Sequence, residues 1–365
     1  MSRFSRKTAL PPSPPRPPAC VQTLVAGALP KLYVGVDIGK KHLDYACLQT
    51  IGRVPNTTEG HAKLRTLIAT HPHAQSATAH FICEATGGYQ DRFVESCHAH
   101  SLTISVINPR QVRDFARSRN LLAKTDKLDA AVCEQYGVAN GPPAHQAPSA
   151  SQVKLVRMMS QLDHLIACRA EEKTRAHELR EDLVKQQVAR IIGHYDTEIQ
   201  LLEKALRQHR DDDAQLLAHA NRVDELAGFD WCGALRLLAY LPELGHLSSE
   251  AAAKMAGVAP LNYDSGQMRG QRHIAGGRAP VRRQLYLSAL SAIQHNAIFK
   301  STYAHLKGQG KPSKVALVAV MRKMLVVLNA ALKDPKIALQ SRVTRSPRKE
   351  PQKAKKPTPA QATAE

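Results

Sequence analysis

Alternating and apolar runs between residues 31 and 140 predict a domain that mixes strands and helices. The runs at residues 32–38 (LYVGVDI) and 43–49 (LDYACLQ) flank a polar Gly-Lys-Lys-His segment, a pattern typical of a β-hairpin. Later patterns predict strands at residues 78–83 and 102–107 and helices near residues 59–69, 89–100, 109–116 and 126–138. Because strands and helices alternate after the hairpin, we expect an α/β domain whose sheet combines antiparallel and parallel strands.

The rest of the chain has the spacing of helices. Residues 140–148 are rich in proline and form a predicted linker. From residue 151 to 226 apolar residues recur every three to four positions without a proline, which predicts a long helical pair or coiled coil that could join protomers, hold nucleic acid or space two domains. A glycine turn between helical stretches at residues 226–242, and apolar helices at residues 279–292 and 313–332, predict an all-α last third.

Both ends of the chain have the composition of disordered segments. Residues 1–30 contain seven of the 22 prolines, and residues 341–365 contain seven lysines or arginines against two glutamates. Such sequences favour solvated backbone over a packed element. We therefore expect a disordered Pro-rich extension at residues 1–30 and a disordered basic tail at residues 340–365, which could add phosphate contacts or only solubilise the chain.

The charge of the chain points to a polyanionic partner. Lysine and arginine total 51 against 31 aspartates and glutamates, a formal net charge of +20. Nucleic acid is the leading partner because such a protein releases counterions from phosphates, although ribosomal, chromatin and membrane-surface proteins can be equally basic. The seven cysteines form no CxxC pair, so we expect reduced thiols in a cytoplasmic, nucleoid-associated protein. No uninterrupted apolar run approaches the ~20 residues of a membrane span, and we expect no membrane partner.

Four carboxylates stand where the pattern places element ends. Asp37 ends the first strand, Glu84 follows a second buried run, and Asp126 and Asp129 lie three residues apart at the start of a helix. Singly, such residues are usually turn formers, helix caps or first-turn acids. As a set in a very basic protein, they predict a Mg²⁺ site, or Mn²⁺ in its place, because clustered carboxylates need a hard cation among them.

A second candidate site is rich in arginine. Residues 265–283 contain no acid and five arginines: Arg269, Arg272, Arg278, Arg282 and Arg283. With their interspersed glycines they have a composition that binds nucleic-acid phosphates. Ser265 at the start of this segment could be a nucleophile toward phosphorus, although a serine before a glycine is more often a turn residue.

These residues lie in motifs that resemble a known family. The motifs are GVDIGK at residues 35–40, EATGGY at 84–89, the Asn-Pro segment at 108–116, KTDKLDA at 124–130, the segment from DSG to GR at 264–278, LY at 285–286 and AVMRKML at 319–325. In this order, over residues 32–334, the chain resembles the Piv-related DEDD transposases of bacterial insertion sequences (insertion-sequence family one-hundred-and-ten). The ends of the chain lie outside the resemblance.

The resemblance implies a domain plan and a chemistry. It implies a RuvC-like, RNase H-type catalytic domain at residues 31–145 in which Asp37, Glu84, Asp126 and Asp129 bind Mg²⁺. A helical segment at residues 151–225 and a transposase domain at 226–335 follow, and in the latter Ser265 matches the serine thought to form a phosphoserine link to DNA. The acidic site of one protomer would complete the active centre of another, and the helical segment would make a homodimer or homotetramer. The implied partners are donor DNA, target DNA and the element's structured noncoding RNA, the bridge RNA.

Three alternatives remain open from the sequence. A RuvC-like structure-specific nuclease would use the acids alone, with water as nucleophile. A noncatalytic nucleic-acid-binding protein would use the acids only as helix caps. A piliation-type site-specific DNA invertase resembles the transposases too closely for the sequence to separate the two.

Overall fold

The computed structural model describes two compact units of the chain. It describes residues 31–48, 50–75, 77–121, 125–262, 264–265, 268–270, 272–337 and 339. The two units divide between Ala147 and Pro148, and residues 141–149, between helices α4 and α5, form no helix or strand. The expected disorder at residues 1–30 and 340–365 falls outside the described residues. The finer division into residues 31–145, 151–225 and 226–335 stays a prediction.

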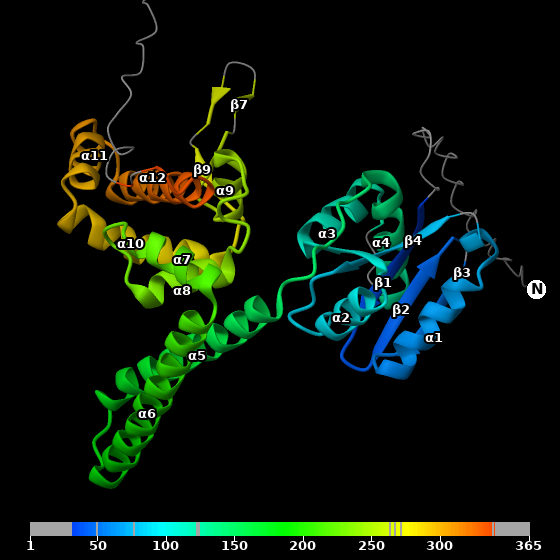
Figure 1. Cartoon of the computed structure of the whole chain (residues 1–365), viewed down its shortest axis with the longest axis horizontal. Helices are drawn as coiled ribbons and strands as arrows, with labels where there is room; N and C mark the ends of the chain where they lie inside the picture. The colour runs from blue at the N-terminus through cyan, green and yellow to red at the C-terminus, as the bar shows by residue number, and fades with distance from the viewer. Residues whose placement is uncertain are drawn as a thin grey trace, which may run out of the picture. The chain divides into compact units, whose positions relative to one another are not determined.

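The first unit is a five-stranded sheet with helices on both faces (Figure 1). Its strands are β1 (Lys31–Ile38), β2 (His42–Cys47), β3 (Thr50–Pro55), β4 (Thr78–Glu84) and β5 (Thr103–Ile107). Its helices are α1 (Thr58–Ala69), the 3-10 helix η1 (Pro72–Gln75), α2 (Asp91–Ala99), α3 (Pro109–Ser118) and α4 (Asp126–Asn140). The strand order is β3-β2-β1-β4-β5, with β1, β2 and β3 antiparallel and β4 and β5 parallel to β1. This mixed sheet confirms the expected one and fits a RuvC-like domain.

Alternation along β1 gives the sheet two different faces. Leu32, Val34 and Val36 pack with apolar residues of α1 and α2. Tyr33 packs on the opposite face, with apolar residues of α3 and α4. Because side chains of a strand alternate between faces, Gly35 and Asp37 point to the same side as Tyr33. Helix α4 therefore covers the sheet face that carries Asp37.

Gly35 lets α4 approach the sheet closely. A Cβ atom at this position would lie 2.0 Å from the carbonyl oxygen of Ala130 and 2.3 Å from the amide nitrogen of Glu134. Both atoms belong to the backbone of α4, so they cannot move away as a flexible side chain would. Glycine is the residue that permits this spacing between strand and helix.

Most elements of the first unit follow the sequence pattern, and one does not. The opening hairpin, the strands at 78–84 and 103–107 and the helices α1 to α4 confirm the predicted elements within a few residues. Strand β3 was not predicted. It lies at the edge of the sheet and buries only Val54 among its six residues, so it lacks the alternation that marks a half-buried strand.

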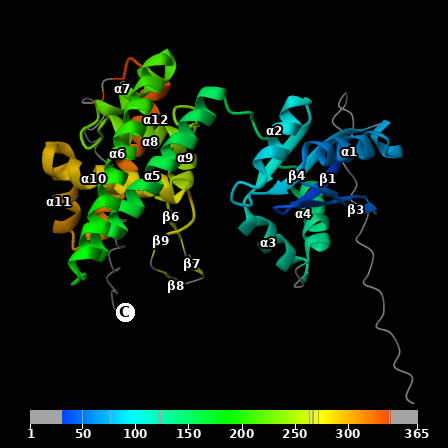
Figure 2. The same cartoon turned by 90° about the horizontal axis from the view of Figure 1, so that it is seen from below.

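The second unit is mainly helical and shares one hydrophobic core. Its helices are α5 (Ala150–Ala176), α6 (Asp182–Asp212), α7 (Ala214–Asp224), α8 (Trp231–Tyr240), α9 (Ser249–Met255), α10 (Ala279–His295), α11 (Ala297–Gly308) and α12 (Ser313–Lys333). Helices α5 and α6 form the expected long pair, visible from a second direction in Figure 2. Arg169 of α5 pairs with Asp196 of α6 at 2.7 Å, and Ser151 bonds to Asp213 just beyond α6, so the two helices run antiparallel.

The expected all-α last third is wrong in one segment. Four short strands interrupt the helices: β6 (Pro260–Leu261), β7 (Asp264–Ser265), β8 (Met268–Arg269) and β9 (His273–Ile274). β6 pairs with β9 and β7 pairs with β8, both antiparallel. Each strand has two residues, too few to produce a visible alternation in the sequence. This insertion between α9 and α10 carries Ser265.

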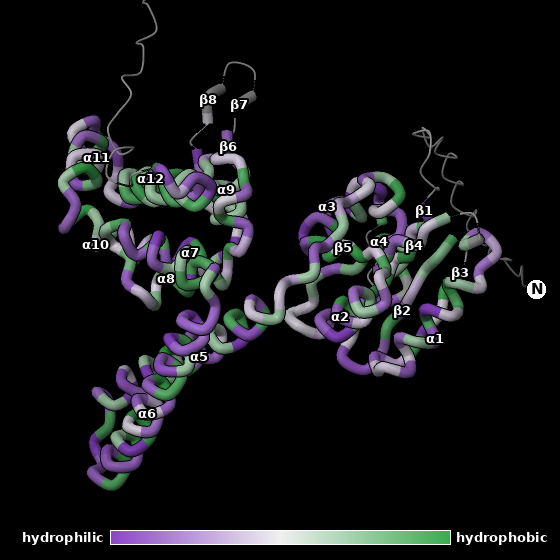
Figure 3. Tube along the Cα trace, viewed as in Figure 1, coloured by the Kyte–Doolittle hydropathy of each residue, from purple (hydrophilic) through white to green (hydrophobic). Residues whose placement is uncertain are grey.

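Helix α12 is a core helix of the second unit. By length and composition it could cross a membrane, with a mean hydropathy of 2.0, but 56% of its apolar window is buried inside the unit. Its hydrophobic character is visible along much of its length in Figure 3, whereas α5 and α6 carry more hydrophilic residues. Its buried side chains belong to the shared core and pack against α7, α9, α10 and α11, so packing within the unit accounts for its composition.

Replacing Gly35 tests the close approach of α4 to the sheet. We expect Gly35→Ala to destabilise the first unit by about 1–3 kcal/mol, the usual cost of overpacking a core. Hydrogen exchange measured peptide by peptide should quicken in β1 and α4. The fluorescence of Trp231, the one tryptophan of the chain, should report unchanged unfolding of the second unit.

Gly193 in α6 is the matched control. A Cβ there meets no atom within 4 Å, so Gly193→Ala should stabilise its helix by about 0.5–1 kcal/mol. Unchanged exchange in β1 and α4 of Gly35→Ala would contradict the packing argument.

Candidate active site

Two of the candidate acids stand at the ends of neighbouring parallel strands. In the pairing of β1 with β4, Val36 lies opposite Cys83, and the next residue on each strand is Asp37 and Glu84. By alternation, Glu84 points to the same sheet face as Ile82, which packs with α3 and α4. Asp37 and Glu84 thus lie side by side on the face that α4 covers.

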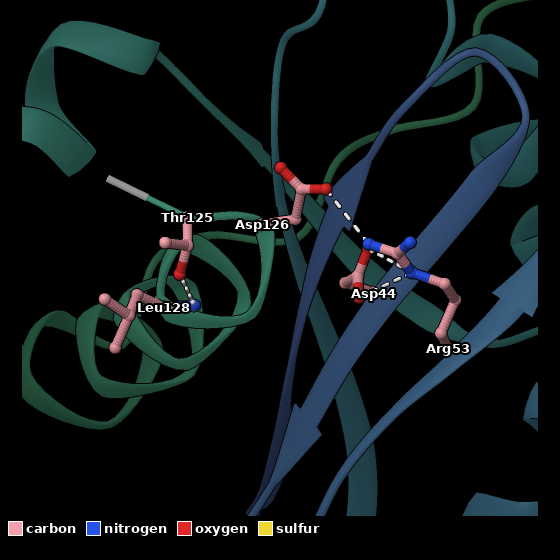
Figure 4. Close-up of polar contacts among 5 residues, drawn as sticks. All are labelled: Asp44, Arg53, Thr125, Asp126 and Leu128. Atoms are coloured by element: carbon pink, nitrogen blue, oxygen red, sulfur yellow. Dashed lines mark hydrogen bonds and ion pairs between the residues drawn. The ribbon is translucent and has the colours of Figure 1, made fainter. Parts of the chain in front are cut away.

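The other two acids come from the first turn of α4. Thr125 is the N-cap of this helix, and its hydroxyl oxygen accepts a hydrogen bond from the Leu128 amide at 3.4 Å (Figure 4). Neither Asp126 nor Asp129 is therefore the cap, although both positions are favourable near the positive end of the helix dipole. Gly35 lies against Ala130, and Gly137, two turns further along α4, lies against Tyr33, so α4 runs antiparallel to β1 and its first turn is at the Asp37 end of the strand. We call Asp37, Glu84, Asp126 and Asp129 the acidic cluster.

The electrostatics of Asp37 show that the acidic cluster is gathered in space. Burial is the largest cause that raises the pKa of Asp37 from 3.8 to about 6, and the charges of Asp129, Glu84 and Asp126 raise it further. Asp44 adds a smaller effect in the same direction. Carboxylates far apart would not do this, because the interaction between charges weakens with distance and screening.

Asp44 is an acid of this region that the sequence reasoning missed. It lies directly opposite Asp37 in the β1–β2 hairpin, and its side chain is only 4% exposed. Arg53 of β3 binds it through two nitrogens, Nε to Oδ1 at 3.0 Å and Nη2 to Oδ2 at 2.9 Å. The same Nη2 donates to Oδ2 of Asp126 at 3.0 Å (Figure 4). The available signal was an aspartate inside an otherwise apolar strand, in hairpin register with Asp37.

The donor set of the acidic cluster fits a hard divalent cation. Carboxylate oxygens are the ligands that Mg²⁺ takes in proteins. A bound cation would offset both causes that raise the pKa of Asp37, which are burial and, after it, repulsion by the neighbouring carboxylates. Within the described part of the chain, no three acidic, histidine or cysteine side chains are placed to hold a metal ion as they stand. Repulsion between carboxylates acts over a longer range than metal ligation, so the raised pKa of Asp37 and the lack of a preformed metal site are compatible.

The arginine-rich segment belongs to the second unit and divides into two groups. Arg278 binds both carboxylate oxygens of Glu243, at 2.7 and 2.6 Å, and also the carbonyl of Tyr240. Arg282 donates to the carbonyl of Gly276. These two side chains thus tie the short-stranded insertion to the helices around it, which sequence composition alone did not indicate.

The other candidate residues of the arginine-rich segment are Arg272, Arg283, Arg269 and Ser265. Arg272 and Arg283 are exposed. For Ser265 and Arg269 the structure describes the backbone, which pairs Ser265 with Met268 across the β7–β8 hairpin.

The raised pKa of Asp37 predicts a pH-dependent stability. A carboxyl whose pKa is higher in the folded state stabilises the fold fully below pH 3.8, and this contribution is lost as the pH rises through about 6. In EDTA, Asp37→Asn should therefore melt several degrees above wild type at pH 7–8, and the gain should shrink toward pH 4. Thermal melts followed by circular dichroism measure it. Asp224→Asn, at an exposed site on α7, is the control, and a pH-independent difference for Asp37→Asn would contradict the clustering.

Two family models match the chain. A transposase model for the IS110-type DEDD domain matches residues 34–183, which include the acidic cluster. A second model, for the transposase IS116/IS110/IS902 family, matches residues 220–304, which include Ser265.

Proteins from Moraxella and Mycobacterium species are similar to the chain. Pilin gene-inverting proteins of Moraxella lacunata and Moraxella bovis are each 28% identical over 316 residues, covering 83% of this chain and 96% of theirs. An uncharacterized 42 kDa protein of the insertion element IS900 from Mycobacterium paratuberculosis is 30% identical over 163 residues, covering 41% of this chain and 38% of its own. With two family matches that cover both units, the chain belongs to the IS110 family of transposases and is a DNA transposase or recombinase.

Proposed function

We propose that this protein is the recombinase of an insertion sequence, which cuts and rejoins donor and target DNA with the acidic cluster of its first unit and Ser265 of its second. The observation that carries the proposal is the meeting of Asp37, Glu84, Asp126 and Asp129 at one end of a RuvC-like sheet. A noncatalytic role for these acids as caps is disfavoured, because Thr125 already caps α4.

The acidic cluster has the residues to hold Mg²⁺, or Mn²⁺ in its place. When bound, such an ion neutralises charge that develops on the phosphate and on the leaving oxygen during phosphoryl transfer. Asp37 and Glu84 offer carboxylates fixed by the sheet, and Asp126 and Asp129 offer carboxylates fixed by the first turn of α4. Two rigid elements thereby set the geometry of a site that must position a phosphate closely.

Ser265 is the proposed nucleophile. Its hydroxyl oxygen forms a bond to a backbone phosphorus, the bond from that phosphorus to a deoxyribose oxygen breaks, the serine proton leaves, and the departing oxygen gains a proton. The phosphoserine linkage to DNA is itself a phosphodiester, so it conserves the free energy of the bond that was broken. A hydroxyl of the exchanged strand can then attack its phosphorus, which rejoins the DNA and releases the serine without an outside energy source. Arg278 and Arg282 tie the C-terminal end of the insertion that carries Ser265 to the neighbouring helices.

A structured noncoding RNA of the element, the bridge RNA, is the proposed guide. Base pairing would then read the donor and target sequences, while the protein binds backbone and shape. The formal net charge of +20 favours contact with this much nucleic acid. We also propose that α5 and α6 act as a coiled-coil pair that joins protomers into a dimer or tetramer.

Trapping of the covalent intermediate tests the proposal. Donor DNA, target DNA, the element's RNA and Mg²⁺ are incubated with wild type, Ser265→Ala and Asp129→Asn, and denaturation-resistant protein–DNA adducts are counted. Wild type should give adduct and joined product. Ser265→Ala should give neither, and Asp129→Asn should lose at least about a hundredfold in rate, the scale for loss of an electrostatic catalytic group.

Free DNA ends without adduct, formed equally by Ser265→Ala, would replace the proposal with a RuvC-like nuclease. Thermal melting of both variants serves as the folding control.

Inversion of a DNA segment is the second candidate activity. The similarity to the pilin gene-inverting proteins favours this activity, because they match the chain over 96% of their length. A plasmid that carries two inverted sites and a separate target plasmid distinguish the activities. Insertion of the element's ends into the target supports the transposase, whereas efficient inversion between the sites with no intermolecular product would make the protein an invertase.

A further inference from the structure

Arg53 is shared between a buried and an exposed carboxylate. Asp44 has a side chain that is 4% exposed, whereas that of Asp126 is 66% exposed and that of Arg53 is 48% exposed. The guanidinium donates hydrogen bonds to Asp44 from Nε and Nη2, and to Asp126 from Nη2 alone. In the described part of the chain, Nη1 makes no hydrogen bond. The contact links β2, β3 and the first turn of α4.

This arrangement differs from an ordinary surface ion pair. A buried carboxylate such as Asp44 is costly unless a charged, hydrogen-bonded partner accompanies it, so Arg53 is held firmly at that end. Exposed pairs lose as much side-chain entropy as they gain in attraction, as for Arg117 and Asp114 on α3, which lie 3.4 Å apart with side chains 64% and 56% exposed. Arg53 thus places a fixed cation beside a carboxylate that would otherwise rotate in solvent.

We propose that Asp44 and Arg53 are positioning residues of the acidic cluster: Asp44 anchors the Arg53 guanidinium on the sheet, and Arg53 orients Asp126 for binding a divalent cation. The inference rests on the proposed metal-binding role of the acidic cluster. One oxygen of Asp126 faces Arg53, which leaves its other oxygen for a cation. Asp44 is also linked to the acidic cluster directly: it lies opposite Asp37 in the pairing of β1 with β2, and the two side chains point to the same face of the sheet.

The shape of arginine is essential to this role. Its planar fork binds Asp44 through two parallel hydrogen bonds and still reaches Asp126, whereas the ammonium of lysine is a compact point charge on a flexible stem. Arg53→Lys therefore keeps the local charge and the neutralisation of Asp44 while it removes the fixed orientation of Asp126. Because the charge is unchanged, a change in cation affinity cannot arise from simple loss of repulsion between Arg53 and the cation.

Binding of Mn²⁺ to the full-length protein without DNA tests the inference. Free Mn²⁺ is measured by electron paramagnetic resonance for wild type, Arg53→Lys, Asp126→Asn, the double variant and Asp37→Asn. We expect Arg53→Lys to weaken binding about tenfold, the lower end of the effect of residues that orient metal ligands. In the Asp126→Asn background, Arg53→Lys should have no further effect, because Arg53 acts through Asp126. Arg117→Lys is the matched control and should bind as wild type.

The outcomes separate this inference from the proposed function. Unchanged affinity of Arg53→Lys, tighter binding, or independent effects of Arg53→Lys and Asp126→Asn would each overturn the positioning role and leave the metal site intact. Wild-type binding no tighter than that of Asp37→Asn would instead overturn the metal site and the inference with it. Thermal melts in EDTA verify folding, and Arg53→Gln combined with Asp44→Asn, which removes both charges together, should reproduce the loss if Arg53→Lys unfolds.

Discussion

The close packing of α4 on β1 at Gly35 is the contact on which the candidate site depends. A strand and a helix far apart in sequence meet there with no side chain between them, and the next alternate residue on the strand, Asp37, lies beside the first turn of the helix. Any larger residue at Gly35 would lift α4 and carry Asp126 and Asp129 away from Asp37. The sheet supplies Glu84 independently, through the parallel pairing of β4 with β1. Backbone packing thus gathers the carboxylates before any cation or substrate contributes.

Gathering like charges has an energetic cost, and the fold compensates only part of it. The N-terminal turn of α4 offers partial positive charge to Asp126 and Asp129, and Arg53 neutralises Asp44 and shares its charge with Asp126. The negative charge of Asp37 remains uncompensated, and burial and the neighbouring carboxylates raise its pKa to about 6. Such perturbed groups are typical of functional sites, where residual charge is kept for a ligand. This uncompensated charge is what the proposed cation-binding role of the acidic cluster would require.

The order of strands and helices in the first unit, and four of its acidic residues, could be predicted from the sequence because each signal comes from neighbouring residues. The β1–β2 hairpin, the apolar run before Glu84 and the first-turn spacing of Asp126 and Asp129 are all readable from neighbouring residues. Strand β3 was missed because an exposed edge strand needs little apolar periodicity. Asp44 and Arg53 were missed for a related reason: their meaning depends on cross-strand register, which pairs residues that the linear pattern does not connect. In the second unit, the bidentate contact of Arg278 with Glu243 could not be read from the sequence, because the two residues lie 35 positions apart; the role of Arg278 as a phosphate ligand stays a prediction.

The contrast between a basic chain and an acidic site has a consequence for the order of binding. A formal net charge of +20 favours association of the whole protein with DNA, yet the acidic cluster would repel a phosphate at the proposed point of reaction. A cation held by the four carboxylates, as proposed, would remove that repulsion locally, so cation and phosphate should bind the site cooperatively. Arg53 fits this scheme because it adds positive charge beside Asp126. Under the proposed function, the overall charge would attract DNA, while the local negative charge would make binding of a phosphate at the acidic cluster depend on the cation.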